Sequence, residues 1–148
     1  MDYAKLTAPC GRDCFNCPFH LALGNPELRR TLSQKRGIPE DDVGCKGCRE
    51  IEGRCKILSY LGFADQCQIY DCFKSKNIGY CFECDNFPCD RLHPLADGAG
   101  QFPHNMKVFN LCRIAKIGVE NWARDEAKKS FDRYYTGKLD SCVGKKTE

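Results

Sequence analysis

The chain has few of the residues and motifs on which most catalytic sites depend. It contains three histidines, none of them spaced as an H-x-x-x-H metal-binding pair. It has neither a glycine-rich phosphate loop nor a G-x-S-x-G nucleophile turn. A catalytic zinc site typically uses His or carboxylate ligands and keeps one coordination position open. The sequence therefore favours a non-enzymatic protein, without excluding an enzyme.

Long apolar segments are absent too. No stretch approaches the roughly 20 apolar residues that a membrane span needs, and residues 1–9 carry no apolar run typical of a secretory signal. We therefore expect no membrane partner and a reducing compartment, the cytoplasm; a secreted fragment separated from its signal is the alternative. The net charge is only +3, from 23 basic and 20 acidic side chains. Charge thus neither favours nor excludes a nucleic-acid partner.

Cysteine is the residue present in excess. Thirteen cysteines in 148 residues is a level typical of disulfide scaffolds and metal clusters. An odd number cannot pair completely into internal disulfides, and in a reducing compartment clustered thiols are typically metal ligands. We predict that the eleven cysteines between residues 10 and 89 bind metal: Cys10, Cys14, Cys17, Cys45, Cys48, Cys55, Cys67, Cys72, Cys81, Cys84 and Cys89.

The spacing of these cysteines supports metal binding. Three C-x2-C pairs occur, at Cys14/Cys17, Cys45/Cys48 and Cys81/Cys84. Two intervening residues let the chain turn so that both sulfurs reach one ion at about 2.3 Å. Since a structural zinc takes four ligands, eleven thiols make two sites with three left over, or three sites if one further ligand joins. His20 and His93 are the candidates, although surface or packing roles explain each histidine better. Sequential and interleaved pairings of the cysteines use the same spacings, so both stay open.

Zinc is the favoured metal, with two or three Zn²⁺ ions per chain. The spacing Cys10-x3-Cys14-x2-Cys17 is also the one with which radical S-adenosylmethionine enzymes hold a [4Fe–4S] cluster, but their large α/β barrel needs more length and more strands than this chain offers. A thiolate-bound iron–sulfur cluster is the alternative. Each structural zinc contributes on the order of 10 kcal/mol to folding, so we expect the cysteine-rich region to be largely unfolded without metal.

The predicted fold is small, metal-bound, α-rich and irregular, with zinc knuckles alternating with short helices. We expect a cysteine-rich region over residues 1–96, a C-terminal helical pair over 104–137 packed on it as one compact unit, and a tail over 138–148. Asn25-Pro26 predicts the start of a helix that runs to Arg36 and stops at Gly37, with Ile38 folding back. A second helix is predicted from Cys67 to Asn77, ending near Gly79, and a turn or two over 88–95.

The C-terminal pattern is clearer. Asn105 is the predicted cap of a helix over Met106–Ile117, after a surface loop at 97–103. A second helix, ended by Gly137, follows from apolar residues at spacings of three and four: Val119, Trp122, Ala123, Ala127, Phe131 and Tyr134. Cys112 lies inside the first helix and is predicted to be a buried small apolar residue. Cys142, in the polar tail, is predicted to be a free thiol.

Four motifs carry a family resemblance: CGRDCFNCP from Cys10, CKGC from Cys45, CQIYDC from Cys67, and CFEC from Cys81 with FPC ending at Cys89. In order and spacing they resemble the prokaryotic family catalogued as domain of unknown function 3795, over residues 8–95. The resemblance implies zinc binding and a bacterial or archaeal cytoplasm. It implies no known reaction.

We predict a structural zinc module that binds another protein, in a pathway the sequence does not reveal. One alternative is a nucleic-acid-binding zinc-ribbon-like protein, because aromatic residues beside the cysteines can stack on bases: Phe15, Phe19, Tyr80, Phe82 and Phe87. Shielding of the metal and filling of a small core explain these aromatics better, and the basic residues between Arg29 and Arg36 form no single stripe. The other alternative is a thiol redox protein or enzyme using Cys10 or Cys55.

Overall fold

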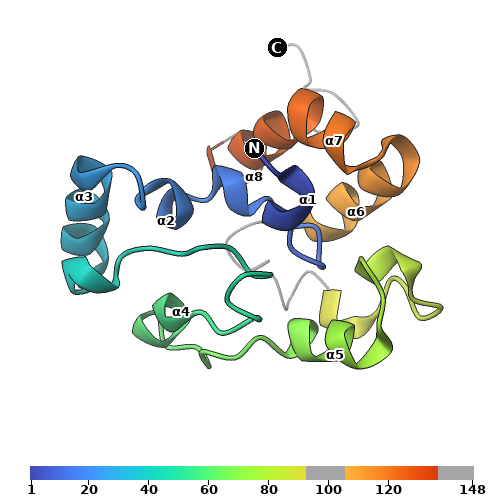
Figure 1. The fold of residues 1–148 in the computed structure, drawn as a ribbon, viewed down its shortest axis with the longest axis horizontal. Coiled ribbons are helices and arrows are strands. Elements are labelled where there is room, and N and C mark those ends of the chain that lie inside the picture. Colours follow the sequence, from blue (N-terminus) through green and yellow to red (C-terminus); the bar gives the residue numbers. More distant parts are fainter. Residues whose placement is uncertain (93–105, 137–148) are drawn as a thin grey trace, which may run out of the picture.

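Short helices joined by irregular loops make up the computed structural model, which describes residues 1–92 and 106–136 (Figure 1). The α-helices are α1 Tyr3–Leu6, α2 Pro18–Leu21, α3 Pro26–Arg36, α4 Lys56–Tyr60, α5 Gln68–Lys76, α6 Met106–Ile117, α7 Val119–Trp122 and α8 Lys128–Thr136. Four short 3₁₀-helices are described: η1 Cys14–Asn16, η2 Glu40–Asp42, η3 Cys81–Glu83 and η4 Asp90–Leu92. One π-helical segment, η6, spans Ala123–Ala127. Within the described residues no strand forms, so the predicted helix-rich fold is confirmed.

The α3 helix has the ends that its sequence predicts. The Asn25 side chain accepts a hydrogen bond from the Leu28 N–H at 3.0 Å, and Pro26 is the first helical residue. Gly37 closes the helix in the left-handed conformation, with φ 64°. The Ile38 N–H then bonds back to the Ser33 carbonyl at 3.2 Å, which places the Ile38 side chain in the core.

The α5 helix, Gln68–Lys76, is one residue shorter at each end than the predicted helix from Cys67 to Asn77. Asn77, and not Gly79, takes the left-handed position, with φ 51°. Asparagine tolerates this conformation better than most residues. We did not predict α1, α2 and α4, because helices of four or five residues are too short to show a periodic pattern.

The C-terminal helices bury most of the predicted stripe, with Val119 and Phe131 only partly buried. The α6 helix has the predicted bounds, and α7, η6 and α8 follow one another without a break. Trp122, Ala123, Ala127 and Tyr134 are buried. The π-helical turn within this run was not predicted, since one wider turn does not change the apolar spacing visibly.

The prediction for Cys112 is wrong, because this cysteine is exposed. The buried face of α6 carries Asn110, Leu111 and Ile114. With 3.6 residues per turn, Cys112 lies about 100° around the helix from Leu111 and turns to solvent.

Three apolar clusters make up the core. The first joins Ala8, Cys10 and Cys14 to Leu92 and Leu111. The second packs Phe15 against four residues of the C-terminal helices: Ile114, Trp122, Ala123 and Ala127. The third lies apart and consists of Ala22, Ile38, Val43 and Ile57. The loops that carry the first cysteines thus pack directly against α6 and α7.

Several predictions fall on residues outside the described ranges. They concern His93, the loop at 97–103, Asn105, Gly137, Cys142 and the tail at 138–148. In the described part of the chain, every helix is too short or too polar to cross a bilayer.

Candidate metal centres

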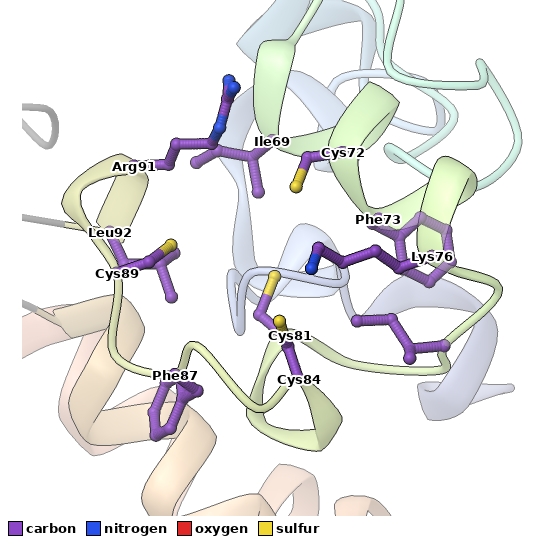
Figure 2. A pocket seen from close by; sticks show the side chains of 11 residues that line it. Ile69, Cys72, Phe73, Lys76, Cys81, Cys84, Phe87, Cys89, Arg91 and Leu92 are labelled. Atoms are coloured by element: carbon purple, nitrogen blue, oxygen red, sulfur yellow. The ribbon is translucent and has the colours of Figure 1, made fainter.

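Four cysteines surround one small cavity, of about 30 Å³. We call them the Cys81 group: Cys72, Cys81, Cys84 and Cys89. Cys72 comes from α5, Cys81 opens η3, and Cys84 and Cys89 lie on the loop that follows (Figure 2). The rest of the wall is mainly apolar, with Ile69, Phe87 and Leu92 among its residues. Residues from two separate helical segments therefore bring four sulfurs to one enclosed place.

The electrostatics of the Cys81 group oppose a cluster of bare thiolates. Burial, followed by the charges of Cys10, Cys89, Cys72 and Cys84, raises the pKa of Cys81 to about 12. One positive charge lies within the group already. The Lys76 ammonium reaches in beside Cys84 (Figure 2) and hydrogen-bonds to it, which raises the pKa of Lys76. A divalent cation bound by these sulfurs would stabilise their thiolate form.

Lys76 is a residue that the sequence reasoning missed. It lies four positions after Cys72 on α5, and residues four apart share a face of a helix. That spacing is the signal that could have identified it.

A second set, the Cys14 group, consists of Cys10, Cys14, Cys48 and Cys67. Cys14 and Cys48 share a side-chain hydrogen bond, which lowers the pKa of Cys14 to about 7 and raises that of Cys48. Cys10 is buried, and burial is the main cause of its raised pKa, with Cys67 contributing. Cys10 also raises the pKa of Cys48, after Cys14 and burial. Cys10, Cys14 and Cys48 also pack in one apolar cluster, and Cys67 lies close enough to Cys10 to affect its pKa.

The three remaining cysteines form the Cys45 group: Cys17, Cys45 and Cys55. A hydrogen bond between Cys45 and Cys55 lowers the pKa of Cys55 to about 6 and raises that of Cys45. Cys17 contributes to the raised pKa of Cys45, after the Cys55 hydrogen bond and burial. Two close sulfurs that share one proton, as Cys45 and Cys55 do, can both become thiolates once a metal ion replaces that proton.

Backbone N–H groups point at several of these sulfurs. Such donors stabilise the thiolate form over the thiol. The Cys10 sulfur accepts from Arg12, Cys17 from Phe19 and His20, Cys45 from Gly47, and Cys55 from Ile57 and Leu58. In each case the donor lies two or three residues further along the chain. These N–H groups offset part of the burial that raises the pKa of Cys10, Cys17 and Cys45, and so favour the thiolate that ligates metal.

The first two C-x2-C pairs interleave, so that Cys14 meets Cys48 while Cys17 neighbours Cys45. The Cys45 N–H donates to the Phe19 carbonyl at 3.0 Å, which fixes the two loops side by side. Gly47 lets the second loop turn here, because its φ of 98° is a conformation that glycine adopts readily. The groups also adjoin, since Cys10 contributes to the raised pKa of Cys81.

Among residues 1–92 and 106–136, no three His, Cys, Asp or Glu side chains are already arranged to hold one ion. An ion would have to draw the sulfurs together through side-chain rotation. The donor chemistry suits such an ion, because soft thiolates in sets of four are the ligands of structural zinc. That all eleven cysteines bind metal remains a prediction.

The aromatic residues beside the cysteines pack into the core. Phe15 is buried, with its ring centroid 6.0 Å from that of Trp122. The Tyr80 and Phe82 rings stack with their centroids 5.5 Å apart. The Arg49 guanidinium lies over the Tyr80 ring, 4.9 Å from its centroid. Phe19 and Phe87 pack against the apolar clusters. These contacts favour a structural role for the aromatics over base stacking.

The fold and the grouped sulfurs define a small, helix-rich, cysteine-rich protein whose thiols gather in three adjoining sets. The sequence profile of the family described as "Protein of unknown function (DUF3795)" matches residues 6–94, and the chain belongs to this family. The predicted resemblance is thereby confirmed. No curated protein and no solved structure matches the chain.

Proposed function

We propose that the protein binds zinc in structural sites made of cysteine and serves as a protein-interaction module in a bacterial or archaeal cytoplasm. The observation that carries this proposal is the Cys81 group: four thiols from α5, η3 and the following loop around one cavity of about 30 Å³. Four thiolates are a complete ligand set for a structural Zn²⁺.

The size of the cavity supports zinc over an iron–sulfur cluster. A cavity needs about 10–15 Å³ to hold one water molecule. The cavity of about 30 Å³ therefore has room for one or two particles the size of water. A single ion fits this space. A [4Fe–4S] cluster would add eight atoms between the same four sulfurs and would require the walls to move apart.

The surroundings support a structural role. A catalytic zinc keeps one position open for water or substrate. Here four half-buried thiols share their cavity with apolar side chains, among them Phe87 and Leu92. A fully ligated zinc in such a setting holds loops in place and performs no hydrolysis.

Another protein is the partner we propose, since metal-held loops present a rigid surface. Phe63 and Phe109 are 66% and 56% exposed, and aromatic side chains are enriched where proteins meet. Nucleic acid is less supported, because the aromatics beside the cysteines are occupied in the core.

Elemental analysis of protein purified without oxygen tests the metal. We expect two or three zinc atoms per chain and no stoichiometric iron or sulfide. Equal amounts of iron and sulfide would establish the iron–sulfur alternative, and metal-free folded protein would end the proposal. Binding of mixed-sequence RNA that weakens with salt would replace the protein partner with nucleic acid.

A further inference from the structure

His20 lies beside the one group of cysteines that lacks a fourth member. The Cys81 group and the Cys14 group have four sulfurs each, whereas the Cys45 group has three: Cys17, Cys45 and Cys55. A closed zinc site needs four ligands. We infer that His20 completes a third zinc site with these three cysteines; this inference rests on the zinc binding proposed above.

The backbone places His20 next to Cys17. Cys17 caps the one-turn helix α2, and His20 is the third residue of that helix. The His20 N–H donates to the Cys17 carbonyl at 2.9 Å and lies close enough to the Cys17 sulfur to favour its thiolate. Residues three apart on a helical turn are neighbours on its surface, so the imidazole starts close to this sulfur.

The side chain of His20 is also hydrogen-bonded to the main chain of Cys45. Its Nδ1 lies 2.8 Å from the Cys45 carbonyl oxygen. A carbonyl oxygen only accepts hydrogen bonds, so Nδ1 carries the proton, and Nε2 of the neutral ring is left with a free lone pair. A ring N–H bonded to a backbone carbonyl is the usual way in which a metal-ligating histidine is oriented.

The neighbourhood of the Cys45 group suits a structural zinc. Cys45 and Cys55 pack against an apolar cluster that includes Ile38, Val43 and Phe19. Among nearby carboxylates, Asp42 is engaged with Lys56 and Tyr60. Asp65 is exposed, and its main-chain carbonyl accepts from the Cys55 N–H at 2.7 Å. A Cys3His set would satisfy Zn²⁺ fully.

Two substitutions distinguish a His20 that ligates zinc from a His20 that only hydrogen-bonds to the Cys45 carbonyl. His20→Asn keeps an N–H that can bond to the Cys45 carbonyl but removes Nε2. His20→Cys supplies a thiolate at the same place. Asp65→Asn is the control, since it removes the carboxylate of the residue whose main-chain carbonyl bonds to the Cys55 N–H. Each full-length variant is analysed for zinc per chain and, after exchange with Co²⁺, for its visible absorption.

We expect three zinc ions in the parent protein and in Asp65→Asn. In His20→Asn one ion should be lost or bound more than about 100-fold more weakly, beyond the 10–100-fold effect of an orienting group. In His20→Cys three ions should remain, and the cobalt ligand-field bands should move to longer wavelength, because thiolate is a weaker-field ligand than imidazole.

Other outcomes would overturn the inference. Three ions and an unchanged cobalt spectrum in His20→Asn would show that His20 only positions Cys45. Loss of an ion from Asp65→Asn would assign the fourth position to that carboxylate. Two ions in both the parent and His20→Asn would remove the third site and leave the proposed function intact, whereas a metal-free parent would remove both. If His20→Asn does not fold, the cobalt bands of His20→Cys decide: no shift means that residue 20 is not a ligand.

Discussion

The side-chain amide of Asn110 donates a hydrogen bond to the Gly11 carbonyl at 2.9 Å, across 99 residues of sequence and with the asparagine fully buried. Gly11 follows Cys10 directly, and Asn110 lies on the buried face of α6. This bond joins the C-terminal helices to the first cysteine loop.

Asn110→Ala should therefore destabilise the protein by about 1–3 kcal/mol, because it leaves the Gly11 carbonyl unpaired in the core. Urea unfolding monitored by circular dichroism measures the change. Asn121→Ala is the matched control: its amide donates to the Ile117 carbonyl at 2.9 Å on the exposed surface, and its effect should stay within about 0.5 kcal/mol. Equal losses in the two variants would contradict this prediction.

Gly11→Ala tests the same contact from the other side. Gly11 has φ 84°, and a Cβ there would lie 2.8 Å from the Lys107 carbonyl oxygen and 2.9 Å from the Leu111 Cγ. Gly62 has φ 81° with no atom within 4 Å, so Gly62→Ala carries the backbone strain alone. We expect the Gly11 variant to lose at least about 1 kcal/mol more in unfolding free energy than the Gly62 variant, through overpacking. A Gly62→Ala variant that is equally unstable would refute the role of the clash.

Removing metal should expose Trp122, the one tryptophan of the chain. Trp122 is fully buried against Phe15, which directly follows Cys14. Because we expect the cysteine-rich region to depend on metal for its folding, chelation should shift the tryptophan emission to longer wavelength and reduce the helical circular dichroism. Chelator already saturated with zinc serves as the control. An unchanged emission and melting temperature after metal is stripped would count against metal-dependent folding.

Thiol alkylation should distinguish ligands from the exposed cysteine of α6. Cys112 is exposed, so it should react rapidly in the native protein, while the eleven predicted ligands should be protected until a chelator is added. Peptide mass spectrometry identifies each modified site; Cys112→Ser removes the fast reaction at residue 112, and Cys142, the predicted free thiol, should still react. Should Cys10 or Cys55 react as fast as Cys112 in the metal-bound protein, the thiol redox alternative gains support.

Lys76 should slow the loss of metal from the Cys81 group. Its ammonium hydrogen-bonds to Cys84 and offsets part of the negative charge of four thiolates. Lys76→Met should release zinc to a chelator about 10–100-fold faster, as is typical when a group that supports a ligand is removed. Lys74→Met, on the same helix but paired with Glu52 at 2.9 Å, should release zinc at the parental rate. Identical release from both variants would show that Lys76 has no such role.

Much of the local structure could be predicted. The ends of α3 follow from Asn25, Pro26 and Gly37, and the bounds of α6 from its apolar spacing. The position of Asn77 at the end of α5 was missed because both asparagine and glycine tolerate a positive φ. The exposure of Cys112 was missed because composition alone does not tell which face of a helix is covered.

The sequence by itself determined that the thiols are clustered, that the chain is helical between the clusters, and which family it belongs to, since all three depend on residue type and spacing. Only the tertiary structure decided which sulfurs meet. Cys14 faces Cys48 and Cys45 faces Cys55. The loops run side by side because the Cys45 N–H bonds to the Phe19 carbonyl and because Gly47 turns the chain with a φ of 98°. Contacts between segments distant in sequence arise from packing, and C-x2-C spacing is the same whichever partner lies opposite.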